Sequence, residues 1–278
     1  MYTYQEALTA SIEYFNGNEY AARVFCDKYA LKNGNILMEK TPDDMHRRLS
    51  REFARIQFKK YGNKGLSEET IYSYLKDFSK IIPQGSPCFA IGNPYQIASI
   101  SNCFVVESPI DSYGGICKTD EELAQISKRR GGVGADVSNI RPRNTPTKNS
   151  SRYATGISLF MHRYSNTIRE VGQDGRRGAL MLSCDIHHPE SVIPLDPTLH
   201  GEEFEVEVNN KELGKYKISS KWYNPNVLDF ATCKYDSTKV TGANISLRLS
   251  DEFLSAVENK TTFQKRWPPV NPTFTEDV

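Results

Sequence analysis

The spacing of apolar residues predicts helices along the first part of the chain. Apolar side chains recur at the spacing of one helix face at Met45, Leu49 and Phe53. Thr41 precedes them and is followed by a proline and two aspartates, residue types favoured at the cap and first turn of a helix. Similar signals predict helices over residues 4–15, 19–30 and 67–82. We therefore expect an N-terminal helical region over residues 1–82.

The pattern then changes to short apolar strands that alternate with amphipathic helices. Strands are predicted near residues 99–106, 132–140, 179–184 and 243–249. Helices are predicted near residues 119–128 and 156–171, and after a capping Ser250. Alternation of this kind is typical of an α/β domain with largely parallel strands. We expect such a domain over residues 83–278.

One segment of this second region departs from the alternation. Glu203-Phe-Glu-Val-Glu-Val208 alternates between polar and apolar residues, and a second short run begins at Tyr216. Asn209-Asn210 lies between the two runs, and asparagine favours turns. We expect a β-hairpin inserted into the α/β domain over residues 192–228.

Composition and charge restrict the class of protein. The chain has 278 residues, of which 38% are hydrophobic and 25% charged, as in an ordinary globular protein of one large or two modest domains. A formal net charge of +1 gives no overall attraction to nucleic acid or anionic membranes, so any phosphate binding has to be local. The sequence contains no secretory leader and no apolar stretch near the roughly 18 residues of a spanning helix. We expect a cytoplasmic protein that binds neither nucleic acid nor membranes.

The cysteines and histidines do not predict a metal site. Six cysteines occur without Cys-x-x-Cys spacing, which argues against both a zinc site and a secreted disulfide framework. His187 and His188 are adjacent, and neighbouring histidines do not easily ligate one ion. We assign no metal.

Cys103 is the candidate for chemistry, because it lies in an apolar strand that precedes two turns rich in glycine and arginine. The first turn spans residues 129–134 and the second spans residues 173–179. Such turns bind anions, so a thiol beside them indicates redox chemistry on a phosphorylated substrate. The first turn alone is a weak signal. It lacks the full dinucleotide fingerprint, which disfavours the alternative of an α/β dehydrogenase.

In this order, Cys103 and the two turns resemble the large, catalytic subunit of ribonucleotide reductase. The resemblance runs from about Tyr4 to Ala256 and corresponds to the N-terminal half of such a subunit. It implies a helical region followed by the first half of a ten-stranded α/β barrel. The family's radical-bearing cysteine lies in the C-terminal half and has no counterpart before Val278. The resemblance therefore implies half of an active site, inactive alone.

The same resemblance assigns residues to the substrate site. Cys103 matches the reducing cysteine, which would form a disulfide with a cysteine of the other half. Ser86 lies where the family holds substrate phosphate, and Asn102 and Gly132 are expected to line the substrate. From the residues alone, the favoured interpretation of Cys103 is a buried strand cysteine, and that of Ser86 is an ordinary Gly-Ser-Pro turn.

Two further sets of residues match regulatory parts of the family. Asp111, Ser112, Ile116 and Arg141 match the site that binds a deoxynucleotide or ATP effector, with the carboxylate on the ribose and the guanidinium on phosphate. The simpler alternatives are a helix-capping Asp-Ser pair and a surface arginine.

The second turn matches the loop between effector and substrate base. There, Gln173 and either Arg176 or Arg177 would contact base edges or phosphate. The alternative is a solvated basic turn.

The resemblance thus implies a ribonucleoside-diphosphate reductase that makes 2′-deoxyribonucleotides for DNA replication. No cofactor is expected on this half, and the whole enzyme would need a radical generator, either a small-subunit metal centre or adenosylcobalamin. The expected partners are the C-terminal half, a radical-generating small subunit, thioredoxin or glutaredoxin as reductant, and a second copy in a homodimer. The main alternative is a non-catalytic deoxynucleotide-binding module that regulates a partner.

Overall fold

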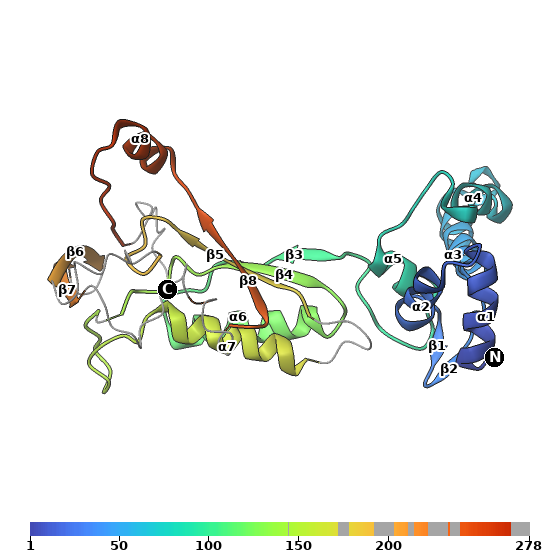
Figure 1. Ribbon diagram of the computed structural model, residues 1–278, viewed down its shortest axis with the longest axis horizontal. Coiled ribbons are helices and arrows are strands. Elements are labelled where there is room, and N and C mark those ends of the chain that lie inside the picture. The colour runs from blue at the N-terminus through green and yellow to red at the C-terminus, as the bar shows by residue number, and fades with distance from the viewer. Residues whose placement is uncertain are drawn as a thin grey trace. The chain divides into compact units, whose positions relative to one another are not determined.

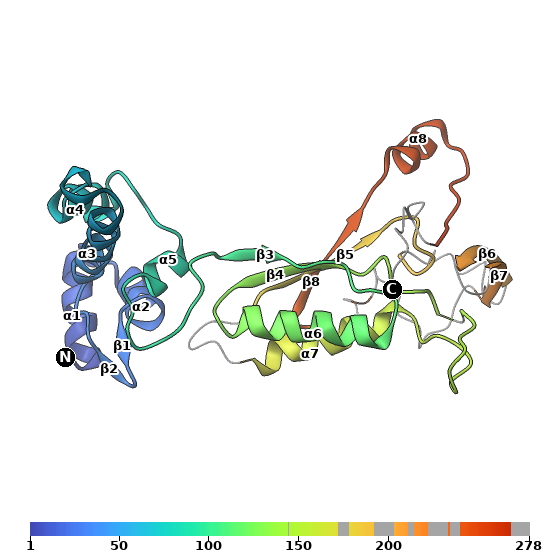
Figure 2. The same ribbon diagram turned by 180° about the vertical axis from the view of Figure 1, so that it is seen from behind.

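The chain is described by a computed structural model. It covers residues 1–143, 145–171, 178–191, 203–210, 214–221, 233 and 240–267. Two compact units are present (Figures 1 and 2). Among the described residues, the first contains 1–103 and 128–131, and the second contains 104–127, 132–171 and those from 178 onward. Residues 83–103, which we assigned to the second domain, are thus grouped with the helices. The division into domains at residue 82 stays a prediction.

The first unit is helical, as expected. Its helices are α1 (Tyr4–Tyr14), α2 (Glu19–Lys28), α3 (Pro42–Tyr61), α4 (Glu68–Leu75) and α5 (Gly85–Ala90), with a short antiparallel pair β1 (Lys32–Asn33) and β2 (Ile36–Leu37). Local sequence fixes the helix starts, because the Asn18 side chain accepts from the N–H of Ala21 and Ser67 accepts from Thr70. Apolar faces then pack around Phe25, Met45 and Leu49, which are buried. The helix predicted over 67–82 ends at Leu75.

A buried ion pair holds α5 in this unit. The Arg48 Nε donates to Glu39 Oε1 at 2.7 Å, and both side chains are less than a tenth exposed. The Arg48 Nη2 also donates to the carbonyl of Cys88 at 2.9 Å, and its Nη1 donates to that of Ile91. Since a buried charge needs such partners, Arg48 fixes where α5 lies against α3. This short helix was not predicted from the sequence.

The second unit is built on a four-stranded sheet, which confirms the predicted α/β class. The strands are β3 (Cys103–Val105), β4 (Gly132–Asp136), β5 (Leu180–Asp185) and β8 (Ala243–Arg248), in the order β3-β4-β5-β8. The first residue of β3, Cys103, is the last residue of the 1–103 segment of the first unit, so the boundary between the units falls within this strand. β4 runs parallel to β5, and β5 runs parallel to β8. The ten-stranded barrel stays a prediction from the resemblance.

Helices α6 (Tyr113–Ser127) and α7 (Ile157–Glu170) lie on the same side of this sheet in both views, and α8 (Asp251–Asn259) follows β8 (Figures 1 and 2). α6 begins earlier than the predicted residue 119, because Ser112 Oγ accepts the N–H of Gly115 at 3.0 Å and caps the helix. Two glycines in this first turn hide its helical character in the sequence. Ser250 caps α8 as expected, accepting from Phe253.

The segment predicted to form a hairpin contains two paired strands. β6 (Glu203–Asn210) runs antiparallel to β7 (Gly214–Lys221), with Glu203 opposite Lys221 and Asn210 opposite Gly214. The intervening residues 211–213 lie outside the described part of the chain. That residues 192–228 are an insertion stays a prediction. Among the described helices, none has the length and apolar character needed to cross a membrane.

Candidate active site and nucleotide pocket

Cys103 opens β3 and its thiol is exposed. Alternate residues of the sheet point to opposite faces, and the face covered by α6 and α7 buries Leu180 and Leu182. On the other face, Val105 is 89% exposed and Met181 is 44% exposed. Cys103 lies on this second face, two residues before Val105. A parallel sheet is ordinarily covered on both faces, whereas these side chains of the second face are exposed among the described residues.

Two predicted substrate residues meet in the helical unit. Ser86 belongs to α5 and is buried, and its backbone N–H donates to Asn102 Oδ1 at 2.8 Å. The Ser86 Oγ lies 3.5 Å from the carbonyl oxygen of Arg130, to which it donates. The side chain next to Cys103 in sequence is therefore held by the start of α5. Gly132, the third predicted substrate residue, is the buried first residue of β4.

All four predicted effector residues line one pocket of the second unit, with a volume of about 310 Å³. Asp111 and Ser112 precede α6, Ile116 lies in its first turns, and Arg141 follows β4. The remaining lining comes from the start of α6, the loop between β4 and α7, and α7 itself: Tyr113, Ile140, Thr147, Lys148, Asn149, Ser151, Tyr153, Ala154, Thr155, Gly156 and Phe160.

Asp111 and Arg141 form the polar centre of this pocket. The Arg141 Nε donates to Asp111 Oδ2 at 2.7 Å, and the Arg141 backbone N–H donates to Oδ1 at 2.9 Å. The Arg141 Nη2 contacts the Asp111 carbonyl oxygen at 3.3 Å. Both side chains stay partly accessible, at 25% and 20% exposure. The carboxylate therefore orients the guanidinium while leaving both groups within reach of a ligand.

Sequence reasoning missed the aromatic and basic residues of the pocket. The rings of Tyr113 and Phe160 contact edge to face, with 6.1 Å between their centroids. Tyr153 is 58% exposed, and Lys148 adds a second cation to that of Arg141. The basic, proline-containing stretch between β4 and α7 is the signal that could have indicated Lys148 and Tyr153, whereas Tyr113 and Phe160 belong to α6 and α7. Together they supply cations for phosphate and flat faces for a base.

The predicted specificity-loop residues Gln173, Arg176 and Arg177 lie outside the described residues, so their contacts stay predictions.

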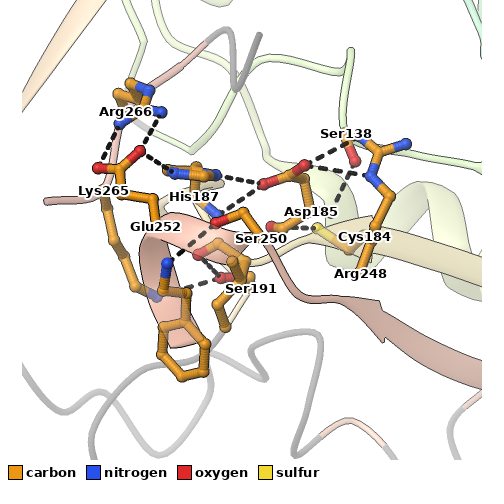
Figure 3. Close-up of polar contacts among 12 residues, drawn as sticks. Ser138, Cys184, Asp185, His187, Ser191, Arg248, Ser250, Glu252, Lys265 and Arg266 are labelled. Atoms are coloured by element: carbon orange, nitrogen blue, oxygen red, sulfur yellow. Dashed lines mark hydrogen bonds and ion pairs between the residues drawn. The ribbon is translucent and has the colours of Figure 1, made fainter. Parts of the chain in front are cut away.

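A second polar cluster lies at the carboxyl ends of β5 and β8 (Figure 3). The His187 Nδ1 lies 2.7 Å from Asp185 Oδ1, and its Nε2 lies 3.1 Å from Glu252 Oε2. Arg248 donates to Asp185, and Arg266 donates to both Glu252 oxygens. Hydrogen bonds from Arg266 and then His187 lower the pKa of Glu252 to about 2.

This cluster of ion pairs and hydrogen bonds joins α8 to the sheet. Burial alone would raise the pKa of Asp185, but hydrogen bonds from His187 and Arg248 outweigh it and lower that pKa. The adjacent His188 is not part of this cluster, and its Nε2 contacts the carbonyl oxygen of Ile140. In the described part of the chain, no three His, Cys, Asp or Glu side chains are grouped as metal ligands.

Comparison with known proteins identifies ribonucleotide reductases as relatives of the chain. Residues 101–277 match the family described as the ribonucleotide reductase barrel domain. The chain is 31% identical over 147 residues to ribonucleoside-diphosphate reductase large chain 2 of Saccharomyces cerevisiae, covering 50% of this chain and 17% of that protein. It is 29% identical over 184 residues to a vitamin B12-dependent ribonucleotide reductase of Rhodopirellula baltica, covering 65% and 16%.

A ribonucleoside-diphosphate reductase large chain of Cryptosporidium parvum is 34% identical over 95 residues, covering 34% of this chain and 12% of that protein. The matched parts thus span less than a fifth of each of these relatives.

Proposed function

We propose that this chain, which belongs to the ribonucleotide reductase barrel-domain family, forms part of a large subunit that reduces ribonucleotides to 2′-deoxyribonucleotides by radical chemistry. In this proposal the chain carries the effector site and the reducing cysteine, and the rest of the large subunit completes the active site. The observation that carries the proposal is the pocket in which Asp111, Ser112 and Arg141 meet from separate elements.

The chemistry of the pocket supports a nucleotide ligand. A guanidinium has five N–H donors, and those of Arg141 that do not contact Asp111 can bind phosphate beside Lys148. Asp111 can accept a hydrogen bond from a ribose hydroxyl. Tyr113 and Phe160 offer faces on which a base can stack. A deoxynucleoside triphosphate or ATP has this combination of groups.

The position of Cys103 supports its role as reductant. Replacing the 2′-hydroxyl by hydrogen and releasing water takes two electrons, which two thiols supply as they join in a disulfide. The exposed Cys103 thiol is one of them, and the second belongs to the rest of the subunit. Ser86, Asn102 and Gly132 would contact substrate, and thioredoxin or glutaredoxin would reduce the disulfide again.

The radical that starts the reaction comes from outside this chain in our proposal, from a small-subunit metal centre or from adenosylcobalamin. Two copies would pair through α6 and α7, which carry exposed apolar side chains such as Leu159 at 55% and Tyr113 at 61%. A non-catalytic nucleotide-binding module is the second candidate, because all the pocket residues belong to the second unit and none of them is Cys103.

The test is calorimetric titration of dTTP, dGTP, dATP and ATP into the purified chain, with Arg141→Ala as the pocket variant. Hydrogen bonds to charged groups contribute roughly 1.5–3 kcal/mol, so we expect about tenfold to a hundredfold weaker binding. Arg55→Ala is the matched control, since it removes a guanidinium paired with Glu52 in the helical unit. Absence of binding by the wild type at millimolar nucleotide, or equal binding by Arg141→Ala, would contradict the proposal.

A further inference from the structure

The loop between β4 and α7 supplies most of one wall of the nucleotide pocket, from Thr147 to Gly156. Its tip is held by its own contacts: the N–H of Thr147 donates to the carbonyl of Arg152, and that of Ala154 donates to Thr145. These bonds shape the loop internally, but they do not fix its two ends to the rest of the unit. The ends have to be anchored elsewhere for Arg141 and Lys148 to face the same ligand.

The anchor is Glu190, which lies beyond β5 in the sequence and is 6% exposed. One of its oxygens, Oε2, accepts the backbone N–H of Arg143 at 3.1 Å and that of Ile157 at 3.0 Å. Arg143 stands at the beginning of the pocket loop, and Ile157 follows its end as the first residue of α7. This carboxylate oxygen therefore joins the two ends of the loop through their backbone, and the Arg143 Nη2 adds a side-chain hydrogen bond to Ser158 Oγ at 3.2 Å.

Gly156 explains how the carboxylate reaches this position. It precedes α7 with φ at +84°, and it has no side chain to cap the helix. A β-carbon built there would overlap Glu190 Oε1, so a larger residue would displace the carboxylate. Glu190 thus caps the start of α7 in place of a local side chain, although it lies 33 residues after Ile157 in the sequence.

His188 supports the same contact. It is fully buried, its Nε2 lies 2.9 Å from the carbonyl oxygen of Ile140, and its Nδ1 accepts the N–H of Glu190 at 3.1 Å. A neutral imidazole with its proton on Nε2 satisfies both contacts. It holds the backbone next to Arg141 and orients Glu190 at once.

We infer that Glu190 is a positioning residue of the nucleotide pocket, which sets the distance between the two ends of the pocket loop through the reach of its carboxylate oxygen. The inference rests on the proposed function of the pocket as an effector site. Both N–H groups meet the same oxygen, whereas the cationic Arg143 Nε lies 3.9 Å from the other oxygen, beyond hydrogen-bond distance. The reach of the side chain therefore matters more than its charge.

Two substitutions separate reach from charge. Glu190→Gln keeps an oxygen at the same reach and removes the charge, whereas Glu190→Asp keeps the charge and shortens the side chain by one methylene. We expect Glu190→Gln to bind dTTP or dATP within about threefold of the wild type, and Glu190→Asp to bind about tenfold more weakly. Hydrogen exchange at the amides of Arg143 and Ile157 should quicken in Glu190→Asp and stay slow in Glu190→Gln.

The outcomes distinguish this inference from the proposed function. Two results, given that the wild type binds nucleotide, would overturn the positioning role. One is an unchanged affinity in Glu190→Asp. The other is a loss of affinity in Glu190→Gln that equals or exceeds the loss in Glu190→Asp. A wild type that binds no nucleotide would overturn the proposed function itself. The exchange rates test the contact of Glu190 with the two loop ends without any ligand. Thermal melting followed by circular dichroism reports separately on whether each variant is folded, so affinities are compared among folded chains.

Discussion

Acidification from about pH 7 to about pH 5 is expected to destabilise the second unit through His188. Burial lowers the pKa of this fully buried imidazole to about 4, although the carbonyl of Ile140 opposes the shift. In an unfolded chain the pKa of histidine is about 6.5. The unfolded state therefore takes up the proton first. The stability that the neutral ring contributes is complete above about pH 6.5 and is lost as the pH falls towards 4.

The magnitude follows from the distance between the two pKa values. At about pH 5 the unfolded histidine is almost fully protonated and the folded one is still neutral, so the loss is about 2 kcal/mol. Asp185, one of the carboxylates near His188, has a lowered pKa and stays ionised over this range. A loss of this size is a large fraction of the roughly 5–15 kcal/mol that stabilises a typical domain.

The assay is urea unfolding followed by Trp267 fluorescence in a Trp222→Phe background. Trp267 is 7% exposed and donates to the Ser138 carbonyl oxygen at 3.1 Å, so it reports on the second unit. The readout has to be local, because burial also lowers the pKa of His46 in the helical unit. His188→Gln does not titrate and should lose about 2 kcal/mol less than the wild type between the two pH values. An equal loss in both chains would refute the reasoning.

Two other predictions follow from contacts of single residues. Gly156→Ala should lower the free energy of unfolding by about 2–4 kcal/mol in urea titrations, because a positive φ and contact with Glu190 both oppose a β-carbon; an unchanged midpoint would contradict this. Iodoacetamide should label the exposed Cys103 and Cys117 in the folded chain but not Cys184, whose thiol pKa is raised by burial. Mass spectrometry of digested protein reads the pattern, and early labelling of Cys184 would show that the sheet is not packed as described.

The family and the alternation of strands and helices could be predicted from the sequence, and both are confirmed. These features depend on local signals. The proline and aspartates after Thr41 start α3, and Ser250 caps α8. Asp111 and Arg141 were expected at one site because of the resemblance to the family, and they meet in one pocket, although their role in binding stays a prediction.

The remaining features depend on contacts between distant residues. The sequence gives no sign that α5 forms, since this short helix is held by Arg48 from α3. Glu190 could not be assigned either, because its partner Ile157 lies 33 residues away and Gly156 carries no capping side chain. Tyr153 enters the pocket only through the path of its loop. Such contacts follow from tertiary packing, and the spacing of apolar and polar residues along the sequence does not predict them.

The most direct test is ribonucleotide reduction by this chain assembled with the other parts of the proposed enzyme, the rest of a large subunit and a radical source. We expect wild-type assemblies to convert a ribonucleoside diphosphate to the deoxy form, measured by chromatography of the nucleotides. We also expect Cys103→Ser to abolish turnover while leaving dTTP binding unchanged, because the pocket does not include Cys103. Equal product from the Cys103→Ser assembly, or no product from the wild type, would contradict the claim that Cys103 is the reducing thiol of half an active site.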